Sequence, residues 1–139
     1  MAAALRFVFH YTAFCVCGLE VGMSTISITK QNFRSITEEK RPFIINFWAE
    51  WSGPCRLFNP IFDMVSTQYP DVMLARINAE TENELAQTFN IQTIPTIVVY
   101  YNHTVLFAHQ GAMSETMLAT IVEKVQKIDM NSIQTDFDL

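Results

Sequence analysis

Residues 24–128 alternate between segments with the apolar spacing of strands and segments with that of helices. Some strand-like segments alternate apolar and polar residues. Others are near-continuous apolar runs, such as F-I-I-N-F-W-A at 43–49, which are typical of strands buried on both faces. The strands are expected at 25–28, 43–49, 72–77, 96–101 and 104–109.

Four helices are predicted between and after these strands, with apolar residues at intervals of three or four. Thr29 and Ser114 have the side chains of N-caps for the first and last helices. Thr81 and Glu84 are predicted to form a capping box at the start of the third. The second helix is expected to bury one stripe of side chains: Leu57, Phe58, Ile61, Phe62 and Val65.

The resulting order is β-α-β-α-β-α-β-β-α, which predicts an α/β fold with a central mixed sheet flanked by helices on both faces. Only Asn102-His103 separates the last two strands. Both residue types tolerate positive φ angles better than most, so these strands are expected to form an antiparallel hairpin. The elements fill a predicted domain at 23–128, with a leader at 1–22 before it and a polar, acidic tail at 129–139 after it.

Composition narrows the possible function. A chain of 139 residues, half of them apolar, suits one domain with a substantial core. The net charge of −5 and the lack of a basic cluster argue against a nucleic-acid partner. Three cysteines are too few for a disulfide scaffold. Cys15 and Cys17, like His103 and His109, lack the further ligands that a metal site requires, so neither a metal nor a cofactor is expected.

Residues 1–22 differ from the rest, because Arg6 and Glu20 are their only charged residues. The apolar run at 7–17 after Arg6 resembles the n-region and h-region of a secretory signal, and 2–19 approaches the length of a membrane span. A misread extension ahead of a true start at Met23 is the other interpretation. The protein is expected to be cytoplasmic, or secreted or membrane-anchored if residues 1–22 are a targeting segment.

The segment at 48–56, between the strand at 43–49 and the next helix, reads W-A-E-W-S-G-P-C-R. It resembles the signature of the thioredoxin family, W-A-x-W-C-G-P-C-[KR], at eight of nine positions. Pro60 matches the proline that kinks the family's helix, residues 93–96 resemble its cis-proline loop, and Gly111 matches the glycine after its last strand. The resemblance covers about residues 24–128 and implies a thioredoxin-like fold.

Two departures from the family pattern concern the redox chemistry. The resemblance implies that the first cysteine of C-G-P-C attacks a disulfide and that the second resolves the mixed disulfide. Here Ser52 replaces the attacking cysteine, and Cys55 stands at the resolving position. Asn46 replaces a buried aspartate that is thought to help take the proton from the resolving thiol, and an amide cannot act as that base. These departures predict a degenerate redox site.

The resemblance implies two alternative functions. The first is a binding module for an extended client peptide, which needs no thiol and little dithiol–disulfide turnover. The second is a protein-disulfide oxidoreductase that uses Cys55 alone with a thiol partner, or a parent form with cysteine at position 52. We expect a monomer, with a membrane partner only if residues 1–22 are kept as an anchor. The expected peptide-binding residues are Trp51, Gly53, Pro54, Ile94, Pro95 and Gly111.

Structural interpretations exist for the same residues. Ser52 is an excellent N-cap, and a free cysteine such as Cys55 is commonly a small buried apolar side chain. These interpretations predict where the two side chains lie, which the structure can test.

Overall fold

The computed structural model describes residues 25–128, so the predictions for the leader and the tail lie outside the described residues. The element order is the one predicted from the apolar pattern. The strands are β1 (Ile26–Ser27), β2 (Phe43–Trp48), β3 (Leu74–Asn78), β4 (Thr96–Tyr101) and β5 (Thr104–Gln110). The helices are α2 (Lys30–Thr37), α3 (Gly53–Gln68), α4 (Asn83–Thr88) and α5 (Glu115–Gln126).

The five strands form one mixed sheet in the order β1-β3-β2-β4-β5. β1, β3 and β2 run parallel, and β4 runs antiparallel to both β2 and β5. Asn102 and His103 have φ angles of +47° and +62° in the turn between β4 and β5, as the hairpin prediction requires. The predicted mixed α/β sheet is confirmed.

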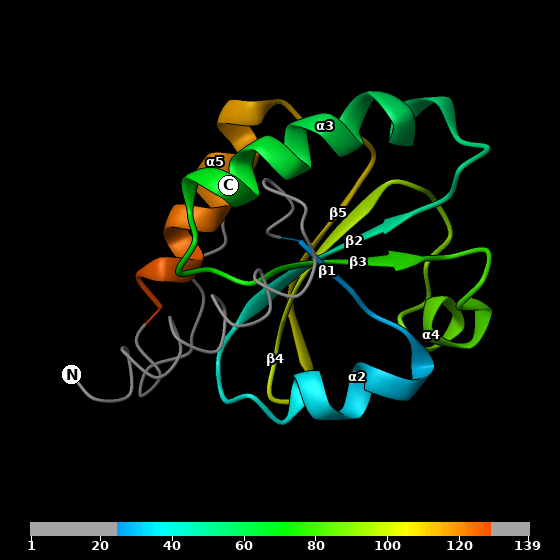
Figure 1. Cartoon of the computed structure of the whole chain (residues 1–139), viewed down its shortest axis with the longest axis horizontal. Coiled ribbons are helices and arrows are strands. Elements are labelled where there is room, and N and C mark those ends of the chain that lie inside the picture. The colour runs from blue at the N-terminus through cyan, green and yellow to red at the C-terminus, as the bar shows by residue number, and fades with distance from the viewer. Residues whose placement is uncertain (1–24, 129–139) are drawn as a thin grey trace, which may run out of the picture.

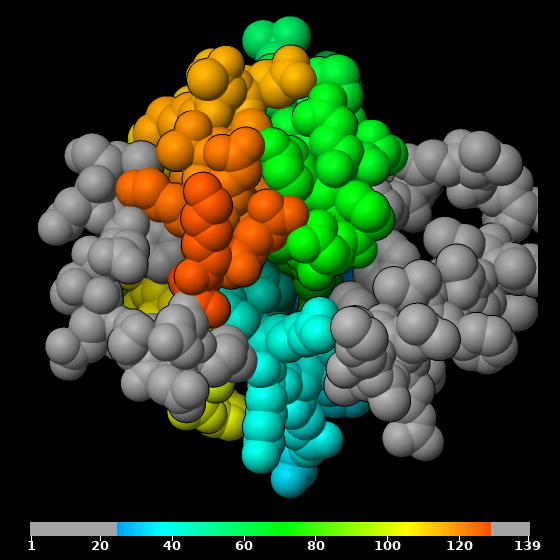
Figure 2. Space-filling view, turned by 90° about the vertical axis from the view of Figure 1, so that its left-hand side faces the viewer, coloured from blue at the N-terminus to red at the C-terminus, as the bar shows by residue number. Residues whose placement is uncertain are grey.

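Helices cover both faces of the sheet (Figure 1), with α3 and α5 above it and α2 and α4 below it in that view. The core on the α3 side centres on Phe58, Phe62 and Leu118, all of which are buried. Phe33 of α2 and Leu85 of α4 pack into the core on the opposite face. Figure 2 shows α5 (orange) and α3 (green) side by side. Because both faces are covered, β2 is buried almost along its whole length.

Two local predictions are wrong. The N-cap of α4 is Glu82, which makes no side-chain cap hydrogen bond, so Thr81 and Glu84 form no capping box. The turn before α4 is instead held by Asn78, whose Oδ1 accepts hydrogen bonds from the backbone N–H groups of Glu80 and Thr81 at 2.9 Å and 3.4 Å. Leu57 is exposed and does not belong to the buried stripe of α3.

None of the helices within residues 25–128 is long and apolar enough to span a membrane.

Candidate functional site

The candidate site lies at one edge of the sheet, where β2 ends and β4 begins. Phe47, next to last in β2, pairs with Thr96, the first residue of β4. The loop that follows Trp48 and the segment that ends at Pro95 therefore meet at the same edge. Thr96 also pairs with Gln110, which brings Gly111 to this edge. The register thus gathers three segments that are far apart in the sequence.

Ser52 is the N-cap of α3. Its backbone is extended, and its Oγ accepts a hydrogen bond from the Cys55 backbone N–H at 3.4 Å. Its carbonyl oxygen accepts the first helical hydrogen bond, from the Arg56 N–H at 3.2 Å. Pro54 fits the first turn, where no carbonyl partner is required. The structural interpretation of Ser52 is confirmed, and its side chain is buried.

Cys55 is a free cysteine, and no part of it is exposed to solvent. It lies in the first turn of α3, the helix that covers one face of the sheet. It is the sole cysteine among residues 25–128. Burial keeps the sulfur out of reach of an external disulfide unless the first turn of α3 moves.

The segment before β4 contains a cis peptide bond between Ile94 and Pro95. The carbonyl oxygen of Pro95 accepts a hydrogen bond from the Gly111 N–H at 2.8 Å. Gly111 has a φ angle of +93°, a region that L side chains rarely adopt, so a glycine is favoured here. The Thr96 hydroxyl donates to the Thr93 carbonyl oxygen and closes the loop from the other side. These bonds fix the Pro95 segment at the edge of the sheet where β2 ends.

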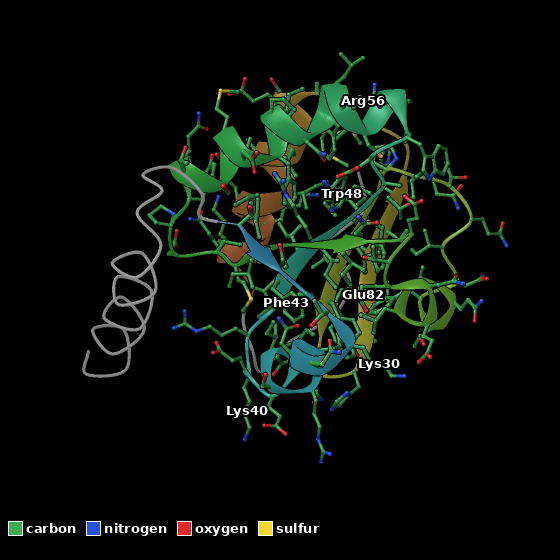
Figure 3. The ribbon with its side chains drawn as sticks, turned by 45° about the vertical axis from the view of Figure 1, so that its right-hand side comes forward. Lys30, Lys40, Phe43, Trp48, Arg56 and Glu82 are labelled. Atoms are coloured by element: carbon green, nitrogen blue, oxygen red, sulfur yellow. The ribbon has the colours of Figure 1, made fainter. Side chains whose placement is uncertain are left out.

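Trp51 is the most exposed aromatic residue of the site, at 68% of its full accessible surface. Gly53 and Pro54 are also exposed, whereas Ile94 is half-buried. Arg56 Nε donates to the Glu50 carbonyl oxygen at 2.9 Å, which ties the loop to the helix. Figure 3 labels Arg56 at the start of α3 and Trp48 at the end of β2. The predicted peptide-binding residues therefore gather at one edge, with Trp51 projecting from it.

Comparison with known proteins agrees with this geometry. The family model described as Thioredoxin matches residues 24–124. The chain belongs to the thioredoxin family. It is 34% identical over 111 residues to "Putative thioredoxin 2" of Streptomyces coelicolor, a match that covers 80% of this chain and 83% of that protein. It is 32% identical over 101 residues to "Thioredoxin" of Buchnera aphidicola subsp. Acyrthosiphon pisum, covering 71% and 94%.

A solved structure gives the same result for the fold. The crystal structure of Chlamydomonas reinhardtii thioredoxin f2 superposes with a TM-score of 0.65 at 25% sequence identity. The match covers 72% of this chain and 95% of that one. The thioredoxin-like fold expected from the W-A-E-W-S-G-P-C-R segment is confirmed.

Asn46 lies in the middle of β2 and is completely buried, at the position where the family resemblance implies a buried aspartate. Its Nδ2 donates to Asn59 Oδ1 on α3 at 3.2 Å. Its Oδ1 accepts no hydrogen bond from any described residue. The position remains polar and lies beneath α3, but it carries no carboxylate.

Sequence reasoning missed the charged neighbours of Asn46. Arg76 of β3 is the strand partner of Asn46. Its Nη2 donates to the Asn59 carbonyl oxygen at 3.5 Å and forms an ion pair with Asp63 of α3. The guanidinium also lies over the Phe62 ring, 5.9 Å from its centroid. The sequence did contain a signal for this charged group, since Arg76 is the one charged residue in the apolar run at 72–77.

The site contains no cluster of metal ligands. Residues 25–128 include no group of three or more histidine, cysteine, aspartate or glutamate side chains placed to hold a metal ion. The polar residues that the structure connects beneath α3 are Asn46, Asn59, Asp63 and Arg76.

Proposed function

We propose that this thioredoxin-family protein binds extended client segments at the edge of the sheet with little dithiol–disulfide turnover. The binding residues of this proposal are Trp51, Gly53, Pro54, Ile94, Pro95 and Gly111. The observation that carries it is the placement of Ser52 and Cys55 in the S-G-P-C motif. Ser52 caps α3, and Cys55 behind it is fully buried.

The chemistry of Ser52 and Cys55 supports low turnover. Thiol–disulfide exchange begins with a thiolate that attacks a disulfide sulfur and passes through a mixed disulfide. A serine hydroxyl at the attacking position forms no disulfide, so the first step lacks its nucleophile. Cys55 has no second thiol among residues 25–128 with which to complete a cycle.

Client binding needs no sulfur. An extended peptide can pair with exposed backbone by strand addition, and side-chain contacts then give specificity. Trp51 supplies a large exposed aromatic surface near the exposed residues Gly53 and Pro54. A flat indole suits apolar or aromatic client side chains, because aromatic residues lose little conformational entropy on binding.

The proposal concerns a monomer that acts on protein or peptide clients in the cytoplasm. Secretion or membrane anchoring is the alternative, in which residues 1–22 act as a targeting segment. Nucleic acid is not a partner in this proposal, since the chain is acidic.

A thiol-free probe tests the binding function. S-carboxymethylated insulin B chain, labelled with a fluorophore, should bind the full chain in an anisotropy titration. Trp51→Ala should weaken binding about tenfold, as expected for loss of an exposed aromatic anchor. Val105→Ala is the matched control, because Val105 is an exposed apolar residue on β5, away from this edge. Equal affinity for both variants contradicts the proposal.

The second candidate is a monothiol oxidoreductase that uses Cys55. It is favoured by one observation, the presence of a cysteine in the first turn of α3, at the position of the family's resolving thiol. Multiple-turnover reduction of a protein disulfide by the unaltered chain, abolished by Cys55→Ala, would establish this function.

A further inference from the structure

Large apolar side chains are exposed mainly around one helix. Residues 25–128 expose four of them, and Trp51, Leu57 and Met64 lie on α3 or in the loop before it. Leu57 is 77% exposed and Met64 is 42% exposed. The fourth, Val105, lies on β5 and is 45% exposed. The outer side of α3 is therefore the main apolar surface of this part of the chain.

Leu57 and Met64 lie on the same side of α3. They are seven residues apart, which is about two helical turns. Pro60 and Ile61 fall between them on this side, since residues three and four apart are neighbours on a helix surface. Leu57, Pro60, Ile61 and Met64 form what we call the α3 stripe, which contains no charged residue. Met64 lies well beyond the residues of the proposed client site, so client binding does not account for it.

The described part of the chain starts beside this stripe. The Thr25 hydroxyl donates to Asp63 Oδ1 at 3.4 Å, and Asp63 directly precedes Met64. Thr25, the first described residue, therefore lies near the Met64 end of the stripe, and 24 residues precede it in the sequence.

The preceding segment has matching chemistry. Residues 7–19 contain no charged residue and include Phe7, Phe9 and Phe14. Even at the helical rise of about 1.5 Å per residue, residues 5–24 would span about 30 Å. The helix from Met64 back to Gly53 is only about 17 Å long by the same rise. The segment is thus long enough to cover the stripe and reach Trp51.

We propose that residues 5–19 of this chain dock on the α3 stripe. The tether at Thr25 makes the association intramolecular, with an effective concentration of about millimolar, so weak apolar contacts are sufficient. Docking removes Leu57 and Met64 from water together with the phenylalanines of the leader. This contact does not depend on client binding at the sheet edge.

Disulfide trapping in the full chain tests the contact. Cys17 of the leader is the native probe, Cys15→Ser removes the other thiol of the leader, and the third native thiol, Cys55, is fully buried. Met64→Cys places the second thiol on the stripe, and Val105→Cys places it on β5. Diamide takes two electrons and two protons from each thiol pair, which leaves the S–S bond. We expect an intramolecular disulfide from Cys17 to position 64 at a rate about tenfold above that to position 105. Peptide mapping without reduction identifies the product.

The chain connection at Thr25 alone favours trapping at position 64, because Thr25 lies beside it. A second variant therefore separates this proximity from apolar docking. Phe9→Ser with Phe14→Ser keeps the tether and both thiols but removes apolar contacts. Trapping at position 64 should then slow about fivefold or more, as expected for the loss of about 1 kcal/mol. An unchanged rate overturns the proposal. So does a product that is mainly intermolecular, since the stripe would then bind a second copy. Circular dichroism of each variant checks that the domain is folded.

Discussion

Asn46 and Arg76 are strand partners in β2 and β3, and both form hydrogen bonds with Asn59 of α3. Asn46 Nδ2 donates to the Asn59 side-chain oxygen at 3.2 Å, and Arg76 Nη2 donates to the Asn59 carbonyl oxygen at 3.5 Å. A cation is thus fixed beside the buried Asn46 side chain. Asp63, one helical turn after Asn59, forms the ion pair with Arg76 instead.

This relationship predicts that an aspartate can be restored at position 46. In Asn46→Asp, the neighbouring guanidinium should stabilise the ionised carboxyl group, and the free energy of unfolding at pH 7 should change by less than about 1–2 kcal/mol. With Arg76→Met the same substitution should cost about 3–5 kcal/mol, because a buried charge is then left unpaired. Urea unfolding of the unaltered chain, the two single variants and the double variant completes the double-mutant cycle. Additive effects would show that the two positions are not coupled.

The Arg76–Asp63 pair should stabilise the domain more than the surface pairs do. The Arg76 side chain is 12% exposed and that of Asp63 is 34% exposed. We expect Asp63→Asn to lower the free energy of unfolding by about 1–2 kcal/mol, less than for a fully buried pair because Asp63 is partly solvated. Glu84→Gln is the control, since the Lys30–Glu84 pair is exposed and should contribute less than about 0.5 kcal/mol. Equal losses in urea unfolding would contradict this ranking.

The fold could be predicted from the sequence because its signals are local and consistent. The apolar runs at 43–49 and 96–101 require cover on both faces, and Asn102-His103 permits the positive φ angles of the hairpin. Thr81 failed as a cap because Asn78, three residues earlier, takes the N–H groups of the turn. Leu57 was wrongly predicted to be a core residue. It lies at the border of the buried stripe of α3, and an apolar side chain at such a border can face either the core or water.

The site could be predicted only in part. Ser52, Cys55 and Pro95 are identified by a contiguous or nearly contiguous motif. The Asn59–Asp63–Arg76 group depends on how α3 lies over β3, a tertiary relationship that helical or strand periodicity does not contain. Asn59 and Asp63 share a face of α3, but nothing in the sequence pairs that face with position 76.

Ser52 should act as a structural cap whether or not a client binds. Ser52→Ala removes the Oγ acceptor for the Cys55 N–H and should cost about 1 kcal/mol. For a domain of this size the melting temperature should fall by about 4–8 °C. Ser114→Ala is a matched comparison, because Ser114 Oγ accepts from the Met117 N–H at 3.2 Å at the start of α5. A Ser52→Ala melt identical to that of the unaltered chain would contradict the structural role.

The rate of disulfide reduction should depend more strongly on the residue at position 52 than on the residue at position 46. The unaltered chain should show little activity in an insulin-reduction assay. Ser52→Cys should restore much more than Asn46→Asp, because nucleophilic attack precedes resolution and help with resolution is useless without an attacker. The combined variant should be the most active. If Asn46→Asp alone restored as much activity as Ser52→Cys, the missing nucleophile at position 52 would not be what limits the reaction.

Cys55 should react slowly with an external thiol reagent. Its sulfur is fully buried, so modification requires local opening of the first turn of α3. We expect 5,5′-dithiobis(2-nitrobenzoate) to modify Cys55 at least about a hundredfold more slowly than the same thiol after denaturation, which corresponds to an opening free energy of about 2.7 kcal/mol or more. The measurement uses a Cys15→Ser, Cys17→Ser background, so that Cys55 is the one remaining thiol. Ser52→Gly is the companion variant: it weakens the cap and should speed the reaction. Rapid modification in the native background would show that Cys55 is accessible in solution, and it would favour the monothiol oxidoreductase over the binding module.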